Sequence, residues 1–235
     1  MNLPRLDSRL STALKYLRQG KRFADIGTDH AYLPIYSVAG GISSFAVASD
    51  INKGPTERAR LHVASYSLSD KIEVLQTDGL HGIEKYSPDD IAIFGMGGEL
   101  IAKIIDEAEW VRSPDIRLIL QPMTCADVLR RYLAENGFDI ISETLSSDTG
   151  KLYVTICCEY SGKEHELSIE EAILGRYNID NAIGSPLFSE LLARAVGAYK
   201  VRLEGKKSAG INTDEEETVL GALLPIQEKT IKEKV

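Results

Sequence analysis

The sequence predicts an α/β fold in which a mostly parallel sheet ends in an antiparallel hairpin and is followed by a helical arm. Short apolar runs alternate with helical periodicity five times before residue 137. Two longer apolar runs, 138–145 and 152–160, then flank turn residues at 148–150. Strand patterns stop near residue 161, where helical spacing takes over. Such alternation places helices on both faces of a parallel sheet.

The chain has 235 residues, 43% of them hydrophobic, which suits one ordinary domain with an appendage. Its apolar runs fall short of the roughly 20 residues that span a bilayer, and its charged start does not resemble a secretory signal. The three cysteines have no metal-binding spacing, and the adjacent pair Cys157 and Cys158 is poorly placed for a disulfide. We therefore expect a cytoplasmic protein with no membrane span and no metal.

A basic helix is expected at the N-terminus. It spans 6–19, with Asp7 or Ser8 as its cap and Gly20 at its end. Residues 1–22 are rich in Lys and Arg, whereas the whole chain has a net charge of −8. This segment is a candidate phosphate contact, or else only a solvated amphipathic helix. The candidate RNA-binding residues are Arg5, Arg9, Arg18 and Arg22.

The alternating elements follow in order. Strands are expected at 23–26, 44–49, 72–76, 90–94 and 117–120, and helices at 31–39, 53–67, 99–108 and 126–136. Pro34 and Pro55 fall in first helical turns, where proline is tolerated, and Gly137 is a C-cap.

The C-terminal part is predicted to be helical. A short helix is expected at 167–177 and longer ones at 186–207 and 214–234, separated by a polar loop. Pro225 should kink or break the last helix. The long helices form an antiparallel, coiled-coil-like hairpin, which serves as a structural arm or a contact surface. We therefore divide the chain into a domain at 1–160 and a helical hairpin domain at 161–235.

Acidic or glycine residues stand just past four consecutive strands, one strand-helix unit apart. In a doubly wound sheet, ligands bind outside the carboxyl ends of the strands, so these residues should meet in one crevice. Each aspartate taken alone is also an ordinary helix cap or turn residue. The residues are Asp25 and Gly27, Asp50, Asp78 and Gly79, and Gly95–Gly98.

Asp25 indicates which ligand fills the crevice. A carboxylate at the end of the first strand would repel a pyrophosphate but suits a ligand with an amine and a sulfonium, such as S-adenosylmethionine (SAM). Asp50 is placed to accept the ribose hydroxyls, and Asp78 to accept from the adenine amino group. The single Gly27 also argues against the three-glycine dinucleotide motif of a NAD-dependent oxidoreductase.

The segment Gly95-Met96-Gly97 is predicted to face the methyl acceptor. Glycines allow a flat base to approach the backbone, and Met96 offers a soft apolar contact. A phosphate-binding nest or a simple turn is the alternative.

Histidines are less informative. His30 is a base or a capping residue, and His62, His81 and His165 are expected at the surface.

With these residues placed, the chain resembles the bacterial tRNA (adenine(22)-N1)-methyltransferase family, a Rossmann-like class I group. The matching stretches are Ala-Asp-Ile-Gly-Thr-Asp-His-Ala-Tyr-Leu-Pro (24–34), Ala-Ser-Asp-Ile-Asn (48–52), Thr-Asp-Gly-Leu (77–80), Phe-Gly-Met-Gly-Gly (94–98) and Leu-Gln-Pro-Met (120–123).

The resemblance implies methyl transfer from SAM to an adenine N1 in the D-arm region of tRNA; a monomer is favoured, although the sequence leaves the oligomeric state open. Cofactor contacts are expected at Asp25, Gly27, Thr28, Asp29, His30, Asp50, Ile51, Asp78, Gly79 and Gly95. From their positions, acceptor-side catalytic roles are expected for Asp29, Tyr32, Gly95, Met96 and Gly97: Asp29 or the backbone carbonyls of 95–97 would accept from the exocyclic amine, and Tyr32 would stack on the base. A small-molecule methyltransferase and an inert SAM-binding module remain alternatives.

Overall fold

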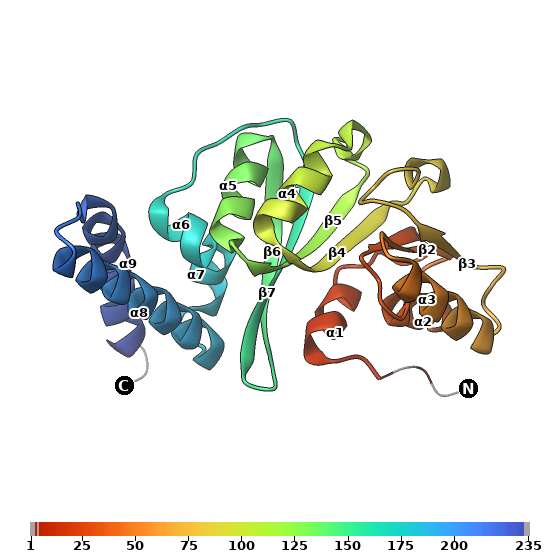
Figure 1. Ribbon diagram of the computed structural model, residues 1–235, viewed down its shortest axis with the longest axis horizontal. Helices are drawn as coiled ribbons and strands as arrows, with labels where there is room; N and C mark the ends of the chain where they lie inside the picture. The colour runs from red at the N-terminus through yellow and green to blue at the C-terminus, as the bar shows by residue number, and fades with distance from the viewer. Residues whose placement is uncertain (1–2, 4, 233–235) are drawn as a thin grey trace.

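A computed structural model describes residue 3 and residues 5–232. Within these residues seven strands form one sheet in the order β3-β2-β1-β4-β5-β7-β6 (Figure 1). The strands are β1 (Arg22–Ile26), β2 (Phe45–Asp50), β3 (Ile72–Gln76), β4 (Asp90–Gly97), β5 (Arg117–Thr124), β6 (Phe138–Asp148) and β7 (Lys151–Tyr160). Neighbours from β3 to β5 are parallel, and β7 is antiparallel to both β5 and β6. The predicted parallel sheet with a terminal hairpin is confirmed.

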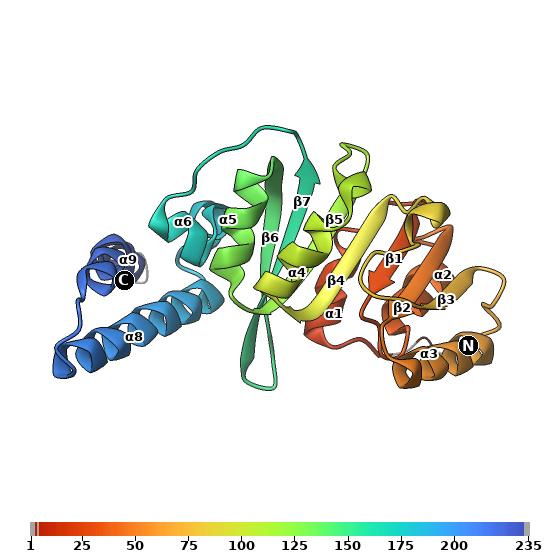
Figure 2. The ribbon, with the colours of Figure 1, turned by 45° about the horizontal axis from the view of Figure 1, so that its top comes forward.

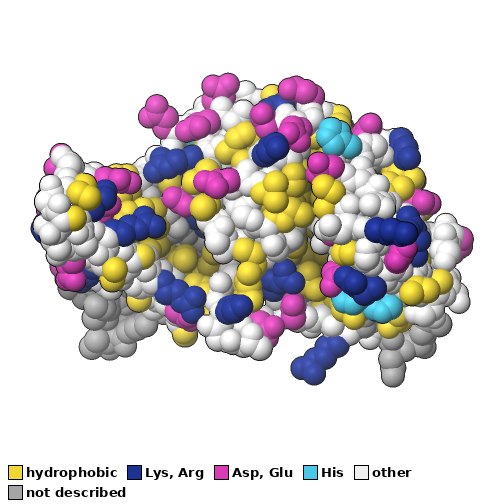
Figure 3. All heavy atoms as spheres, in the orientation of Figure 1, with side chains coloured by type: hydrophobic (Ala, Val, Ile, Leu, Met, Phe, Trp, Pro, Cys, Tyr) yellow, Lys and Arg dark blue, Asp and Glu magenta, His cyan; other side chains and the backbone are white. Residues whose placement is uncertain are grey.

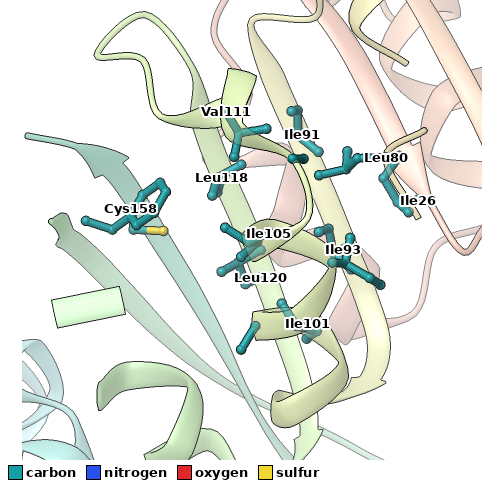
Figure 4. Close-up of a cluster of buried hydrophobic side chains, with 14 of the residues drawn as sticks. Ile26, Leu80, Ile91, Ile93, Ile101, Ile105, Val111, Leu118, Leu120 and Cys158 are labelled. Carbon is teal, nitrogen blue, oxygen red and sulfur yellow. The ribbon is translucent and has the colours of Figure 1, made fainter. Parts of the chain in front are cut away.

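Helices cover both faces of the sheet (Figure 2). One face carries α1 (Ser8–Leu14), α2 (Tyr32–Ala39) and α3 (Lys53–Ser65), and the other carries α4 (Gly98–Asp106) and α5 (Ala126–Glu135). Successive strand residues enter opposite cores: Cys157 packs with the first face and Cys158 with the second. Both cysteines are free thiols, as their positions on opposite faces require. Figure 4 shows Ile101 and Ile105 of α4 in the second core.

Two central strands run further than expected. β4 continues to Gly97 and β5 to Thr124, although they were predicted to end at Phe94 and Leu120. The pairing between them shifts register on both sides of Met96. Pro122 is tolerated because β7 pairs with β5 only as far as Leu120, so no partner on that side requires its missing N–H. The segment Gly95–Gly97 is therefore a bulged strand end rather than a loop.

The N-terminal helix is shorter than predicted. α1 ends at Leu14, whereas the sequence pattern continued to residue 19. The backbone N–H of Arg18 donates to Asp90 Oδ2 at 2.7 Å, and not to a carbonyl one turn earlier. This contact with β4 draws the chain out of the helix.

The C-terminal region differs in two places. Gly175, with φ 86°, separates α6 (Ile169–Leu174) from α7 (Arg176–Ala182), where a single helix was expected. Helices α8 (Pro186–Ser208) and α9 (Asp214–Lys232) form the predicted hairpin around Leu192, Val196, Leu220 and Leu223. α9 continues through Pro225, so the expected break is wrong, and Ile226 beyond it still packs in the same cluster. The alternative of a kink at Pro225 stays a prediction. The last two residues of the predicted helix lie outside the described residues.

Two 3-10 turns, Glu84–Tyr86 and Glu109–Val111, complete the described elements. Among the described helices, none has the length and apolar character that crossing a membrane requires. In the part of the chain that the structure describes, no group of three or more His, Cys, Asp or Glu side chains is placed to hold a metal ion. The division at residue 160 remains a prediction.

Candidate active site

A cavity of about 310 Å³ opens at the carboxyl ends of β1 and β4. The N-terminal segment forms one wall of it, and the turn after β1 forms the opposite wall. The lining residues are Arg5, Asp7, Arg9, Leu10, Asp25, Gly27, Thr28, Asp29, His30, Tyr32 and Phe94. The structure thus brings together most of the predicted residues from the first motif with two of the predicted arginines.

The turn after β1 is fixed by backbone hydrogen bonds. The N–H groups of Gly27 and Thr28 both donate to the Ser49 carbonyl of β2 at 2.8 Å. The hydroxyl of Thr28 accepts from the Ala31 N–H at 3.0 Å, just before α2 begins. These two N–H groups are therefore bound within the sheet and are not available to a ligand. Their role is to hold the strand end and the start of α2 in place.

Met96 lies directly against Gly27. A Cβ atom added to Gly27 would lie 2.3 Å from the terminal methyl carbon of Met96, and Gly27 has φ 80°. Any larger residue would therefore have a strained backbone, and the flexible end of Met96 would have to move aside. This contact joins the predicted cofactor turn to the predicted acceptor strand end.

The carboxylate of Asp25 is buried at the base of the cavity, with 6% of the residue exposed. Burial raises its pKa to about 6, while a hydrogen bond from Thr28 and the charge of Arg9 act in the opposite direction. At neutral pH most of these carboxyls are ionised. A buried anion of this kind favours a cationic ligand.

Asp50 and Asp78 stand at the neighbouring strand ends and not in this cavity. Asp50 ends β2, and its Oδ1 accepts from the Asn52 N–H at 2.7 Å. Asp78 is exposed in the turn after β3, followed by Gly79 with φ 52°. Ile51 is 56% exposed beside Asp50. These residues extend the row of strand ends from the cavity toward the edge of the sheet.

The sequence did not predict the role of Gln121. Its Oε1 accepts from the Gly95 N–H at 3.2 Å and from Arg9 Nη1 at 3.3 Å, and the residue is fully buried. Gly95 itself has φ 78°. A buried side-chain amide needs hydrogen-bond partners. The position of Gln121 directly after an apolar strand was therefore the feature of the sequence that indicated such contacts.

The carboxylate of Asp29 is held by two neighbouring side chains, Arg58 and His30. Its Oδ1 accepts from the Arg58 guanidinium of α3, and its Oδ2 lies 3.1 Å from His30 Nε2. The ring of His30 also stacks with those of Tyr32 and His62. His62 was expected at the surface, but it is half-buried and its ring stacks with that of His30. Neither Arg58 nor His62 lies in a recognisable motif.

The four predicted RNA-binding arginines occupy two separate places. Arg5 and Arg9 line the cavity. Arg18 and Arg22 lie at the amino ends of the strands, where Arg18 Nε donates to Asp90 Oδ1 at 2.7 Å and Arg22 Nε donates to the Tyr86 carbonyl at 2.6 Å. The structure does not bring them onto one face with Arg5 and Arg9.

Residues 6–156 match the model of a family described as "Methyltransferase domain". The tRNA (adenine(22)-N(1))-methyltransferase of Bacillus subtilis is 38% identical over 164 residues, which cover 70% of this chain and 69% of that protein. The crystal structure of the B. subtilis tRNA methyltransferase TrmK is similar with a TM-score of 0.82 and 30% identity over all of both chains.

The Streptococcus pneumoniae protein Sp1610, solved in complex with S-adenosyl-L-methionine, has a TM-score of 0.84 and 29% identity, covering 95% of this chain and 100% of that one. Both likenesses extend over the helical arm as well as the sheet. The chain therefore belongs to the Rossmann-like methyltransferase family that contains the tRNA (adenine(22)-N(1))-methyltransferase of B. subtilis.

Proposed function

We propose that this protein transfers a methyl group from SAM to N1 of the adenine at position 22 of tRNA. The observation that carries the proposal is the 38% identity to the B. subtilis enzyme of that name over 70% of the chain. The cavity beside Asp25 and Gly27 supports it, because it places an anionic group and a tight turn where a methyltransferase sheet binds its cofactor.

The described residues fit SAM. The buried Asp25 carboxylate suits the cationic end of the molecule, and Asp50 has a second carboxylate oxygen beyond the one that Asn52 contacts. Asp78 and Ile51 are exposed at the adjoining strand ends, where they can face an adenosine. When bound, SAM supplies a methyl group on a positively charged sulfur.

The protein mainly has to align the reacting atoms. Adenine N1 has a lone pair and needs no strong base: the N1–methyl bond forms as the sulfur–methyl bond breaks, and the sulfur keeps the electron pair. N1 lies on the Watson–Crick edge, so the base must leave any pairing and enter a pocket. Holding N1, the methyl carbon and sulfur in line provides most of the acceleration.

The acceptor side is assigned to residues around the cavity mouth. The backbone carbonyls of 95–97, or the Asp29 carboxylate, accept from the exocyclic amine and stabilise the cationic product. Asp29 is already paired with Arg58 and His30, so the carbonyls are the better supported candidates. Gln121 and Arg9 hold Gly95 in position for this role.

We further propose that the enzyme acts as a monomer in the cytoplasm, with tRNA as its partner. In support, α8 and α9 bury Phe188, Leu192, Val196, Val219, Leu220 and Leu223 within the same chain. The three free thiols also suit a reducing compartment.

The experiment that tests the function combines purified protein, labelled SAM and bulk unmodified tRNA, followed by nucleoside analysis. We expect N1-methyladenosine that maps to the D-arm side. SAM binding without transfer to tRNA would leave the cofactor assignment standing and would reject the substrate.

A further inference from the structure

Three aromatic rings gather beside the cavity without a role in the mechanism above. His30 and Tyr32 have centroids 5.0 Å apart, His30 and His62 5.1 Å, and Tyr32 and His62 5.4 Å. Their planes are within 12° to 21° of one another. We call these three residues the aromatic platform.

The platform is held in place by polar contacts. His62 Nδ1 lies 3.2 Å from the His30 carbonyl, and His30 Nε2 lies 3.1 Å from Asp29 Oδ2. Asp29 in turn accepts from Arg58, which is on the same helix as His62. Residues from the turn after β1 and from α3 therefore fix the rings before any ligand arrives.

A second cavity, of about 420 Å³, adjoins the first one over this platform. Its lining consists of Arg5, Tyr32, His62, Ser65 and Tyr66. Arg5 and Tyr32 line both cavities, so the two spaces share a wall. Figure 3 shows histidine side chains next to Lys and Arg side chains over the region of α2 and α3.

The chemistry of this second cavity matches an unpaired nucleotide. Aromatic rings bind any nucleobase by stacking, and a nearby guanidinium suits the attached phosphate. The cavity is too open to exclude water and lacks the buried carboxylate that marks the first one. A target adenine must leave its stack to react, which also exposes the neighbouring base.

We propose that the second cavity binds the nucleobase next to the methylated adenine, stacked on His62 and Tyr66, with Arg5 at the intervening phosphate. The inference rests on the proposed function, because it requires an RNA whose target adenine lies at the mouth of the first cavity. It assigns His62 to substrate binding and not to methyl transfer.

The test compares wild type, His62→Ala, His62→Phe and the control His165→Ala in tRNA methylation with labelled SAM. His165 is a suitable control because it is an exposed histidine whose ring nitrogen also lies near a backbone carbonyl, far along the chain after β7. We expect His62→Ala to raise KM for tRNA about tenfold, with kcat and the Kd for SAM little changed. His62→Phe keeps a flat ring and should restore most of the affinity, while His165→Ala should match wild type.

A second measurement does not depend on turnover. The Kd of a short, fluorescein-labelled single-stranded RNA is measured by anisotropy for the same four proteins. If His62→Ala weakens this binding while wild type fails to methylate tRNA, the proposed function fails and the nucleobase site stands. Unchanged RNA binding and unchanged KM in His62→Ala would overturn the site. A fall in kcat alone would also overturn the site, because the rings would then act on the reacting adenine. A loss of SAM binding and of thermal stability that His62→Phe does not rescue would overturn it too, because the rings would then only stabilise the fold.

Discussion

The carboxylate of Asp25 decides how the site responds to pH. Its pKa of about 6 in the folded protein exceeds the ordinary value of 3.8 because the group is buried. Its contribution to folding is therefore most favourable below pH 3.8 and is lost as pH rises through 6. The affinity for a cationic ligand has the opposite pH dependence and rises with pH, since the ligand binds the ionised carboxylate.

We therefore expect the affinity for SAM to fall by about tenfold per pH unit below pH 6. Asp25→Asn should bind SAM weakly at pH 7 and show no such dependence. Calorimetric titration between pH 5 and 8 measures both effects. Asp50→Asn is the control: it should weaken binding without moving the midpoint, and an unchanged pH profile in Asp25→Asn would reject the assignment.

Gly20 is a suitable control for a substitution at Gly27. Both have left-handed backbones, with φ 80° and 77°, but a Cβ at Gly20 meets nothing within 4 Å, whereas one at Gly27 meets Met96. Gly20→Ala should lower the free energy of unfolding by about 1–2 kcal/mol through the backbone alone. Gly27→Ala should lose more and should also lose SAM affinity. Urea unfolding of both, and of Gly27→Ala with Met96→Ala, measures the crowding, and equal losses in the two single variants would show that Met96 simply moves away.

At this scale the sequence predicted residues that follow a strand, because strand ends meet at one edge whatever the side chains do. It located Asp25, Gly27 and Met96 in this way. It did not predict contacts between residues distant in the chain, such as Gln121 with Arg9 or His62 with His30. These contacts depend on how α1 and α3 pack against the rest of the molecule, which no local sequence pattern predicts.

Helices α6 and α7 are joined to the sheet by a buried ionic cluster. Arg130 of α5 donates to Glu143 of β6 at 2.8 Å and to two carbonyls at the end of α6. Asn178 of α7 donates to the other oxygen of Glu143 at 3.1 Å. Both charged side chains are almost fully buried, at 1% and 0% exposed. The positive φ of Gly175 places its backbone against this carboxylate.

We expect Glu143→Gln to lower the free energy of unfolding by about 3–5 kcal/mol, because it leaves the Arg130 charge buried without a counter-charge. SAM affinity should persist in the folded fraction, since none of these residues lines the cavity. Urea unfolding measures the loss. Glu57→Gln breaks the exposed pair with Lys53 and should stay within about 0.5 kcal/mol of wild type. A similarly small loss in Glu143→Gln would mean that the cluster does not hold the arm.

The elements that the sequence located best are those whose burial follows a local period, namely the strands and the two long helices. Three of the missed boundaries involve a distant partner. α1 ends early because Asp90 captures Arg18, and α6 and α7 separate where Gly175 meets Glu143. β4 and β5 run on because each supports the other beyond the core.

For the whole molecule, an acidic chain with a net charge of −8 must bind a polyanion through a local basic surface. The structure separates the arginines of the N-terminal segment into an exposed one at the cavities, Arg5, and one paired with a buried carboxylate, Arg18. Asp90 is 1% exposed at its side chain, so its partner is fixed. The two arginines should therefore answer differently to the same change.

We expect Arg5→Glu to weaken tRNA binding and to reduce the slope of log Kd against log salt by about one. Arg18→Glu should instead destabilise the fold by roughly 3 kcal/mol or more, because it places a carboxylate beside buried Asp90, while tRNA affinity per folded molecule persists. Filter binding of tRNA at several salt concentrations, together with thermal unfolding, separates the two effects. If Arg18→Glu alone lowered the salt slope, the RNA would have to pass the amino ends of the strands. The molecule would then bind tRNA on the side opposite its catalytic cavity, and the adenine could not reach Gly95.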